Sequence, residues 1–196
     1  MKKFGQTNNK PKTIIGIDYS LTSPAVCIND EGDLMFYYLT SKKKYIGQMA
    51  KNIIGYEHQE YDTPIKRFSQ ISDWVFDILK DTFHKQQQVY IEGYSFGSKG
   101  QGIFQIAENC GILKYRLQEQ NLPYETVVPS VVKKGATGKG NADKDMMYNA
   151  FVAETNIDLK SIFETEKVGN PISDIADSYF IQKVGYENSI KSTKTS

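Results

Sequence analysis

The sequence predicts an α/β fold with a mixed five-stranded sheet, in which an antiparallel three-strand meander is followed by parallel strands. Two short apolar runs support this class, IIGID (14–18) and VYIE (89–92), and each ends on a carboxylate. Continuous β-branched runs of this kind are typical of strands buried on both faces in the middle of a sheet. Helical and strand patterns alternate after the first three strands, which indicates one mixed-sheet domain.

Each element follows from its local pattern. β-rich runs predict strands at 13–18, 24–28, 34–40, 89–92 and 124–128. The spacing of apolar residues predicts helices at 64–83, 103–120, 143–154 and 171–184, and one helical turn at 129–134. The polar stretch 41–62 is predicted to be a long loop or small insertion, and 158–169 a charged connector. We expect the domain to span 13–188, between a flexible leader at 1–12 and a flexible tail at 189–196.

Composition limits the classes of function. The 196 residues, of which 39% are hydrophobic, suffice for one packed core. The net charge of +1 gives no bulk attraction for polyanions, but lysines gather locally. Their two clusters are Lys42, Lys43 and Lys44, and Lys133, Lys134, Lys139 and Lys144. No apolar run approaches the ~18 residues of a membrane span, and the N-terminus lacks the apolar core of a signal peptide. Cys27 and Cys110 are expected to be buried free thiols, which suits a reducing cytoplasm.

Four carboxylates stand out by position. Asp18 and Glu92 end predicted strands, while Asp174 and Asp177 are three residues apart and share one face of the last helix. Each has an ordinary structural reading, such as an Asx turn for Asp18, a helix cap for Glu92 or a helix-dipole position for Asp174. Four converging carboxylates, however, repel one another unless a cation neutralises them, and oxygen ligands suit Mg²⁺ or Mn²⁺. The set therefore predicts a metal site.

Four motifs carry a resemblance to a known family. They are GIDYS (16–20), IEGYSFG (91–97), VVKKGATGKGNADKDMM (131–147) and SDIADSYFI (173–181). In this order they resemble the RuvC-type Holliday junction resolvases of the RNase H-like nuclease superfamily. The resemblance implies an RNase H-like sheet with helices on both faces. It also implies two Mg²⁺ ions, which Mn²⁺ can replace, bound by Asp18, Glu92, Asp174 and Asp177.

The resemblance further implies roles for residues around the acids. Lys144 matches the family's lysine at a loop-to-helix junction, where its ammonium would offset charge on the scissile phosphate. A solvated surface lysine is the alternative. Lys133 matches a basic position that contacts DNA, and an aromatic residue after the glutamate, Tyr94 or Phe96, either stacks on bases or packs in the core. Further phosphate contacts are expected from Lys99, Lys134 and Lys139.

These features predict a Mg²⁺-dependent, structure-selective endonuclease of DNA recombination and repair. It would resolve four-way junctions by paired symmetric nicks, through two-metal phosphodiester hydrolysis, as a homodimer in the cytoplasm of a bacterial or infected host cell. Tyr19 and Ser20 replace the family's proline–glycine pair after Asp18, which suits a divergent, phage-borne member. Two alternatives stay open, a broader nuclease for flaps and other branched DNA, and an actin-like phosphotransferase, which shares an early G-x-D strand. The four acids disfavour a non-catalytic DNA-binding relative.

Overall fold

The computed structural model describes residues 13–83, 86–94 and 102–194. They form a seven-stranded mixed sheet in the order β4-β5-β3-β2-β1-β6-β7. The strands are β1 (Thr13–Asp18), β2 (Ala25–Asp30), β3 (Asp33–Thr40), β4 (Gly47–Ala50), β5 (Ile53–Glu57), β6 (Gln87–Glu92) and β7 (Tyr124–Val127). β1, β2 and β3 form the predicted antiparallel meander, and β6 and β7 run parallel to β1. The predicted α/β class is confirmed.

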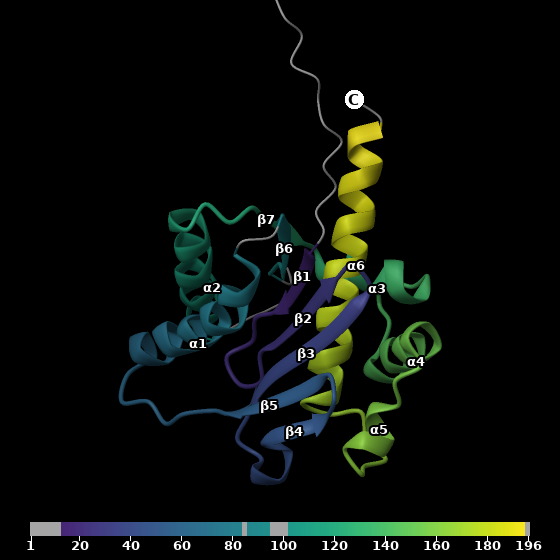
Figure 1. Cartoon of the computed structure of the whole chain (residues 1–196), viewed down its shortest axis with the longest axis horizontal. Helices are drawn as coiled ribbons and strands as arrows, with labels where there is room; N and C mark the ends of the chain where they lie inside the picture. The colour runs from purple at the N-terminus through teal and green to yellow at the C-terminus, as the bar shows by residue number, and fades with distance from the viewer. Residues whose placement is uncertain (1–12, 84–85, 95–101, 195–196) are drawn as a thin grey trace, which may run out of the picture.

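Helices cover both faces of the sheet (Figure 1). They are α1 (Pro64–Leu79), α2 (Gly102–Glu119), α3 (Pro129–Thr137), α4 (Lys144–Thr155), α5 (Leu159–Ile162) and α6 (Ile172–Lys194), with 3-10 turns at Lys43–Tyr45 and Lys80–Thr82. On one face, α1 and α2 bury their apolar side chains against β1, β2 and β6. On the other face, α6 crosses β1, with α3 and α4 packed beside it. β1 is therefore covered on both faces, as its continuous apolar run predicts.

The stretch 41–62, predicted to be a long loop or small insertion, is not a loop, and the predicted count of five strands is wrong. This stretch contains a 3-10 turn and the strands β4 and β5, which extend the sheet beyond β3. Ile53 is fully buried, and Gly55 passes so close to Tyr45 that a Cβ would lie 2.2 Å from the Tyr45 carbonyl oxygen. Tyr38 on β3 donates a hydrogen bond to that same oxygen. Contacts with β3 thus create the two strands, and a local sequence pattern does not contain such contacts.

Three other boundaries differ from the prediction. α3 has 9 residues rather than one turn, and α5 interrupts the connector at 158–169. α6 continues to Lys194, beyond the expected domain end at 188 and through most of the expected tail. Tyr90 on β6 stabilises this extension, because its ring packs against Gly185 and its Oη lies 2.9 Å from Ser189 Oγ. The predicted leader at 1–12 lies outside the described residues.

The two cysteines behave as predicted. Cys27 and Cys110 are both free and buried. Burial raises the pKa of the Cys110 thiol, which keeps it protonated and unreactive. In the described part of the chain, no helix has the length and apolar character needed to cross a membrane.

Candidate active site

The alternation of side chains along β1 sets the direction of the Asp18 side chain. Ile15 and Ile17 belong to the core beneath α1 and α2. Because side chains alternate along a strand, Gly16 and Asp18 face α6 instead. Gly16 lies directly against that helix, since a Cβ at this position would be 2.1 Å from the Ser178 carbonyl oxygen. Asp18 is only 9% exposed, so its carboxylate lies largely out of water at the end of a core strand.

β6 repeats this arrangement one strand away. Ile91 belongs to the core beneath α1 and α2, whereas Tyr90 belongs to the core beneath α6. Glu92, two residues after Tyr90, therefore faces α6 as well. β1 and β6 are parallel with Ile17 opposite Ile91, so Asp18 and Glu92 end neighbouring strands at the same level. The repeated pattern of an apolar run ending on an acid thus places two carboxylates side by side.

α6 brings the other two acids to this edge of the sheet. Asp174 is 8% exposed, and Asp177, one turn later, is half-buried. Ser23, in the loop after β1, donates its hydroxyl hydrogen to Asp174 Oδ2 at 2.7 Å. The start of α6 is therefore tied to the segment that follows Asp18.

The pKa shifts show that the four carboxylates interact. Burial, and then the charges of Glu92, Asp174 and Asp177, hold the pKa of Asp18 well above its usual range. Burial, Glu92 and Asp174 raise the pKa of Asp177 to about 7, and burial raises the pKa of Asp174 to about 6. Burial also raises the pKa of Glu92, while the charge of Lys133 opposes that increase. Mutually repelling, partly desolvated acids of this kind cluster at functional sites.

Lys144 is the first residue of α4, and it contacts Ser173, the residue before Asp174. Its Nζ donates to Ser173 Oγ at 3.3 Å, and Ser173 precedes Asp174 in the chain. The start of α4 is itself well defined, because the Asp143 side chain caps it by accepting from the Met146 backbone N–H at 2.9 Å. Lys144 is exposed, and its charge opposes the increase in the pKa of Asp174 and Asp177. Its role at the scissile phosphate stays a prediction.

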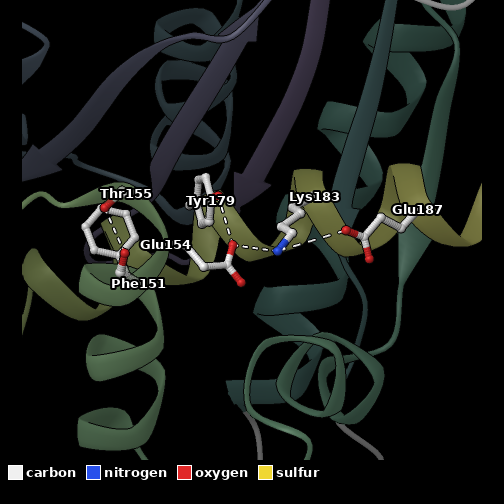
Figure 2. A network of polar contacts seen from close by, with 6 residues as sticks. All are labelled: Phe151, Glu154, Thr155, Tyr179, Lys183 and Glu187. Carbon is white, nitrogen blue, oxygen red and sulfur yellow. Dashed lines mark hydrogen bonds and ion pairs between the residues drawn. The ribbon is translucent and has the colours of Figure 1, made fainter.

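A polar network holds α4 against α6 (Figure 2). Glu154 on α4 accepts hydrogen bonds from Tyr179 Oη at 3.0 Å and from Lys183 Nζ at 2.5 Å, both on α6. α6 also carries Asp174, so this contact helps to fix where Lys144, at the other end of α4, lies relative to that acid.

A cleft of about 590 Å³ opens beside the acids. Asp18, Glu92 and Asp177 line it, together with Lys133 from α3 and Tyr94 from the segment after β6. Tyr94 is 42% exposed, which excludes the alternative that it packs in the core. The cleft therefore combines carboxylates, a cation and an exposed aromatic ring.

The remaining predicted contact residues lie around this cleft or beyond the described residues. Lys134 on α3 and Lys139 in the α3–α4 loop are both exposed. Phe96 and Lys99 fall outside the described residues. Sequence reasoning missed Ser23 and Ser173. Ser173 adjoins Asp174 and could have been found by its position, whereas the Ser23 contact joins residues 151 positions apart and has no local signal.

The four acids fit a hard divalent cation. All are carboxylates, and no ion pair among residues 13–83, 86–94 and 102–194 reaches any of them. Over the same ranges, no three His, Cys, Asp or Glu side chains form a ready-made cage for a metal ion. These carboxylates would hold the ion, and its positive charge would relieve their mutual repulsion. Mg²⁺ takes oxygen ligands in a near-octahedral arrangement and keeps several of its water molecules.

Neutralising Asp177 should stabilise the metal-free protein at high pH. The folded-state pKa of about 7 lies well above 3.8, the ordinary value of an aspartate, so the stability contributed by the protonated form is present below about pH 4 and lost as the pH rises through 7. We expect Asp177→Asn to raise the free energy of unfolding by about 1–2 kcal/mol at about pH 8, and by much less at pH 4.

Urea unfolding in EDTA measures this difference. Added Mg²⁺ should reverse the order of the two proteins, because it stabilises only the protein that keeps all its ligands. A metal-free Asp177→Asn variant that is less stable than the unmodified protein at pH 8 would contradict the electrostatic picture.

Known proteins resemble this chain in both sequence and fold. The family model described as "Crossover junction endodeoxyribonuclease RuvC" matches residues 40–173. A protein of that name from Brachyspira hyodysenteriae is 29% identical over 92 residues, which are 47% of this chain and 54% of the relative. The match thus spans about half the length of that curated relative.

Two solved structures share the fold. The structure titled "Thermus thermophilus RuvC structure" superposes with a TM-score of 0.56 at 16% identity, covering 91% of this chain and 96% of the other. The one titled "T. thermophilus RuvC in complex with Holliday junction substrate" gives a TM-score of 0.60 at 15% identity, covering 92% and 96%. The family match includes Glu92, Lys133 and Lys144, and the structure adds Asp18 and the α6 acids beside them. The chain belongs to the family of the crossover junction endodeoxyribonuclease RuvC.

Proposed function

We propose that this protein is a Mg²⁺-dependent, structure-selective DNA endonuclease that resolves four-way junctions by paired symmetric nicks. The observation that carries the proposal is the convergence of four carboxylates from β1, β6 and α6 beside a cleft that also contains Lys133. The name of its family, crossover junction endodeoxyribonuclease, agrees with this chemistry. Two free buried thiols suit the reducing cytoplasm, where chromosomal or phage DNA would be the substrate.

Each polar residue has a role that its position supports. Asp18, Glu92, Asp174 and Asp177 would hold two Mg²⁺ ions, or Mn²⁺ in their place, and such ions activate water and stabilise the leaving oxygen of a phosphodiester. The hydroxyl of Ser23 orients Asp174. The ammonium of Lys144, beside Ser173, offsets negative charge that builds on the scissile phosphate.

DNA binding would use the lysines and aromatic rings around the cleft. Lys133, Lys134 and Lys139 form a basic edge on α3 and the following loop that suits backbone phosphates. Tyr94, at the cleft and exposed, offers a stacking surface for a base at the strained junction centre. The sequence places Phe96 and Lys99 close by in the chain, and we propose that they contribute in the same way.

A homodimer would supply two active sites for two symmetric cuts. α2 presents a stripe of residues at helical spacing that would pack against α2 of a second copy. The stripe consists of Phe104, Ala107, Gly111 and Tyr115. Phe104 and Tyr115 are 68% and 64% exposed, and nothing lies within 4 Å of a Cβ built at Gly111, so another helix could approach closely there.

We expect Phe104→Glu to convert a dimer to a monomer in sedimentation equilibrium and to replace paired nicks by single, uncoupled nicks. Ile65→Glu is the matched control, because Ile65 is 61% exposed on α1 and lies outside the stripe. A Phe104→Glu protein that stays dimeric, or an unmodified protein that is monomeric at working concentrations, would refute the α2 interface.

The proposed activity is tested by incubating the purified chain with synthetic four-way junctions and Mg²⁺ and mapping cuts on all four strands. Two nicks at symmetric positions on opposing strands are the expected result. Single nicks at equal rates on flaps, forks and junctions would instead indicate a broader branched-DNA nuclease. No cleavage of any of these substrates would overturn the proposal.

A further inference from the structure

The loop between β1 and β2 lines the cleft, and hydrogen bonds both within the loop and from other elements hold it. Directly after Asp18, residues 19–22 form part of the cleft wall. Within the loop, the Ser23 N–H bonds Ser20 Oγ at 3.1 Å, and Ser23 Oγ then donates to Asp174. The course of this loop therefore decides whether the Ser23 hydroxyl reaches the carboxylate on α6.

Two donors from other elements converge on one carbonyl of this loop. Arg67 on α1 donates from NH2 to the Leu21 carbonyl oxygen at 2.6 Å, and His58 Nε2 lies 3.0 Å from the same oxygen. His58 follows β5, and its backbone N–H bonds the Thr40 carbonyl oxygen at 3.0 Å, which ties it to the end of β3. The stretch 41–62 thus contacts the active-site loop as well as extending the sheet.

Both ring nitrogens of His58 have polar neighbours. A carbonyl oxygen only accepts, so Nε2 carries the hydrogen of the bond to Leu21. On the other side of the ring, Nδ1 lies 2.8 Å from Tyr61 Oη and 3.3 Å from the Gln59 carbonyl oxygen. Arg67 also approaches the Tyr61 ring, with its Cζ 5.9 Å from the centroid. The three side chains form one unit, which we call the Leu21 clamp.

We propose that the Leu21 clamp, Arg67, His58 and Tyr61, positions the loop after Asp18 so that Ser23 orients Asp174 for metal binding. These are positioning residues, because none of them lines the cleft and they act through the loop backbone. This inference rests on the proposed function of the four acids as metal ligands. It also assigns a task to the segment between β3 and α1, which carries two of the three clamp residues.

The test compares the full-length chain with Arg67→Ala, Ser23→Ala and the double variant. Groups that orient metal ligands typically contribute 10–100-fold in metal affinity or activity. We therefore expect Arg67→Ala to weaken Mn²⁺ binding, measured calorimetrically without DNA, by roughly 10-fold or more. The kcat for junction cleavage should fall, while KM for the junction stays within about twofold, since no clamp residue lines the cleft.

The double variant distinguishes positioning from general stabilisation. If Arg67 acts through Ser23, the double variant should bind Mn²⁺ no more weakly than the Ser23→Ala variant alone. Lys66→Ala is the matched control, because Lys66 neighbours Arg67 but is exposed and pairs only with the nearby Asp62 among the described residues. Unmodified Mn²⁺ affinity in Arg67→Ala, or independent losses that multiply in the double variant, would overturn the proposal.

A second pair of variants covers the case in which Arg67→Ala does not fold. His58→Gln keeps an N–H donor for the Leu21 carbonyl and should retain Mn²⁺ affinity, whereas His58→Leu should lose about as much as Arg67→Ala. Equal loss in both His58 variants would contradict the clamp.

Failure of the proposed function can be told apart from failure of the clamp. If the unmodified chain neither binds Mn²⁺ nor cuts DNA, the metal-site proposal fails. The clamp is then judged by amide hydrogen exchange at residues 20–23 without metal, in the more stable of the Arg67→Ala and His58→Leu variants. Faster exchange there supports the clamp as a loop anchor, and unchanged exchange refutes it.

Discussion

Replacing Asp18 by asparagine is expected to lower junction cleavage by roughly 10³-fold while junction binding stays within a few-fold. Asparagine keeps the shape of the side chain but removes one negative charge from the centre of the four acids. The metal site loses a charged ligand, whereas the lysines that would contact DNA are unchanged. The variant should also fold, because burial and three neighbouring carboxylates disfavour the ionised Asp18. Gel-shift and single-turnover cleavage assays on one synthetic junction measure both quantities.

Asp33→Asn is the control for Asp18→Asn. Asp33 begins β3 and is exposed, so the same chemical change there removes a charge without touching the four acids. We expect cleavage by this variant to equal that of the unmodified protein. Cleavage by Asp18→Asn within tenfold of the unmodified rate would exclude Asp18 as a metal ligand, and the site assignment would have to be abandoned.

Adding a single methyl group at Gly16 is expected to destabilise the protein by about 3 kcal/mol. A Cβ at this position would lie 2.1 Å from the Ser178 carbonyl oxygen and 2.6 Å from the Gln182 backbone nitrogen. Both atoms belong to the backbone of α6, which cannot move aside as a flexible side chain could. Gly16→Ala therefore either unfolds the chain or pushes α6 away from β1.

Displacement of α6 would also disrupt the site, because the helix carries Asp174 and Asp177 while β1 carries Asp18. We expect Gly16→Ala to lose Mn²⁺ affinity even at temperatures where circular dichroism shows it folded. Gly169→Ala provides the comparison, since nothing lies within 4 Å of a Cβ built there. A Gly16→Ala protein with unchanged urea midpoint and Mn²⁺ affinity would show that α6 is not held against β1 as the structure has it.

Much of the site could be predicted because its signals are local. Asp18 and Glu92 each end a buried apolar run, and the three-residue spacing of Asp174 and Asp177 places both on one helical face. Alternation along a strand and the helical repeat are properties of a few consecutive residues, so the chain alone indicates which acids share a face. The α/β class and the antiparallel meander follow from the same local periodicities.

Other features depend on contacts between residues that are far apart in the chain, so they could not be predicted from local patterns. β4 and β5 exist because β3 offers an edge, and because Gly55 lets the Tyr45 carbonyl and the Tyr38 side chain approach closely. α6 extends into the expected tail because Tyr90 on β6 contacts Gly185 and Ser189. The contact of Ser23 with Asp174 joins segments that only the packing of α6 onto β1 brings together. Such contacts depend on which surfaces meet after folding, so no local pattern encodes them. The four acids, in contrast, could be selected from the sequence because each stands at the end of a strand pattern or on one face of a helix pattern.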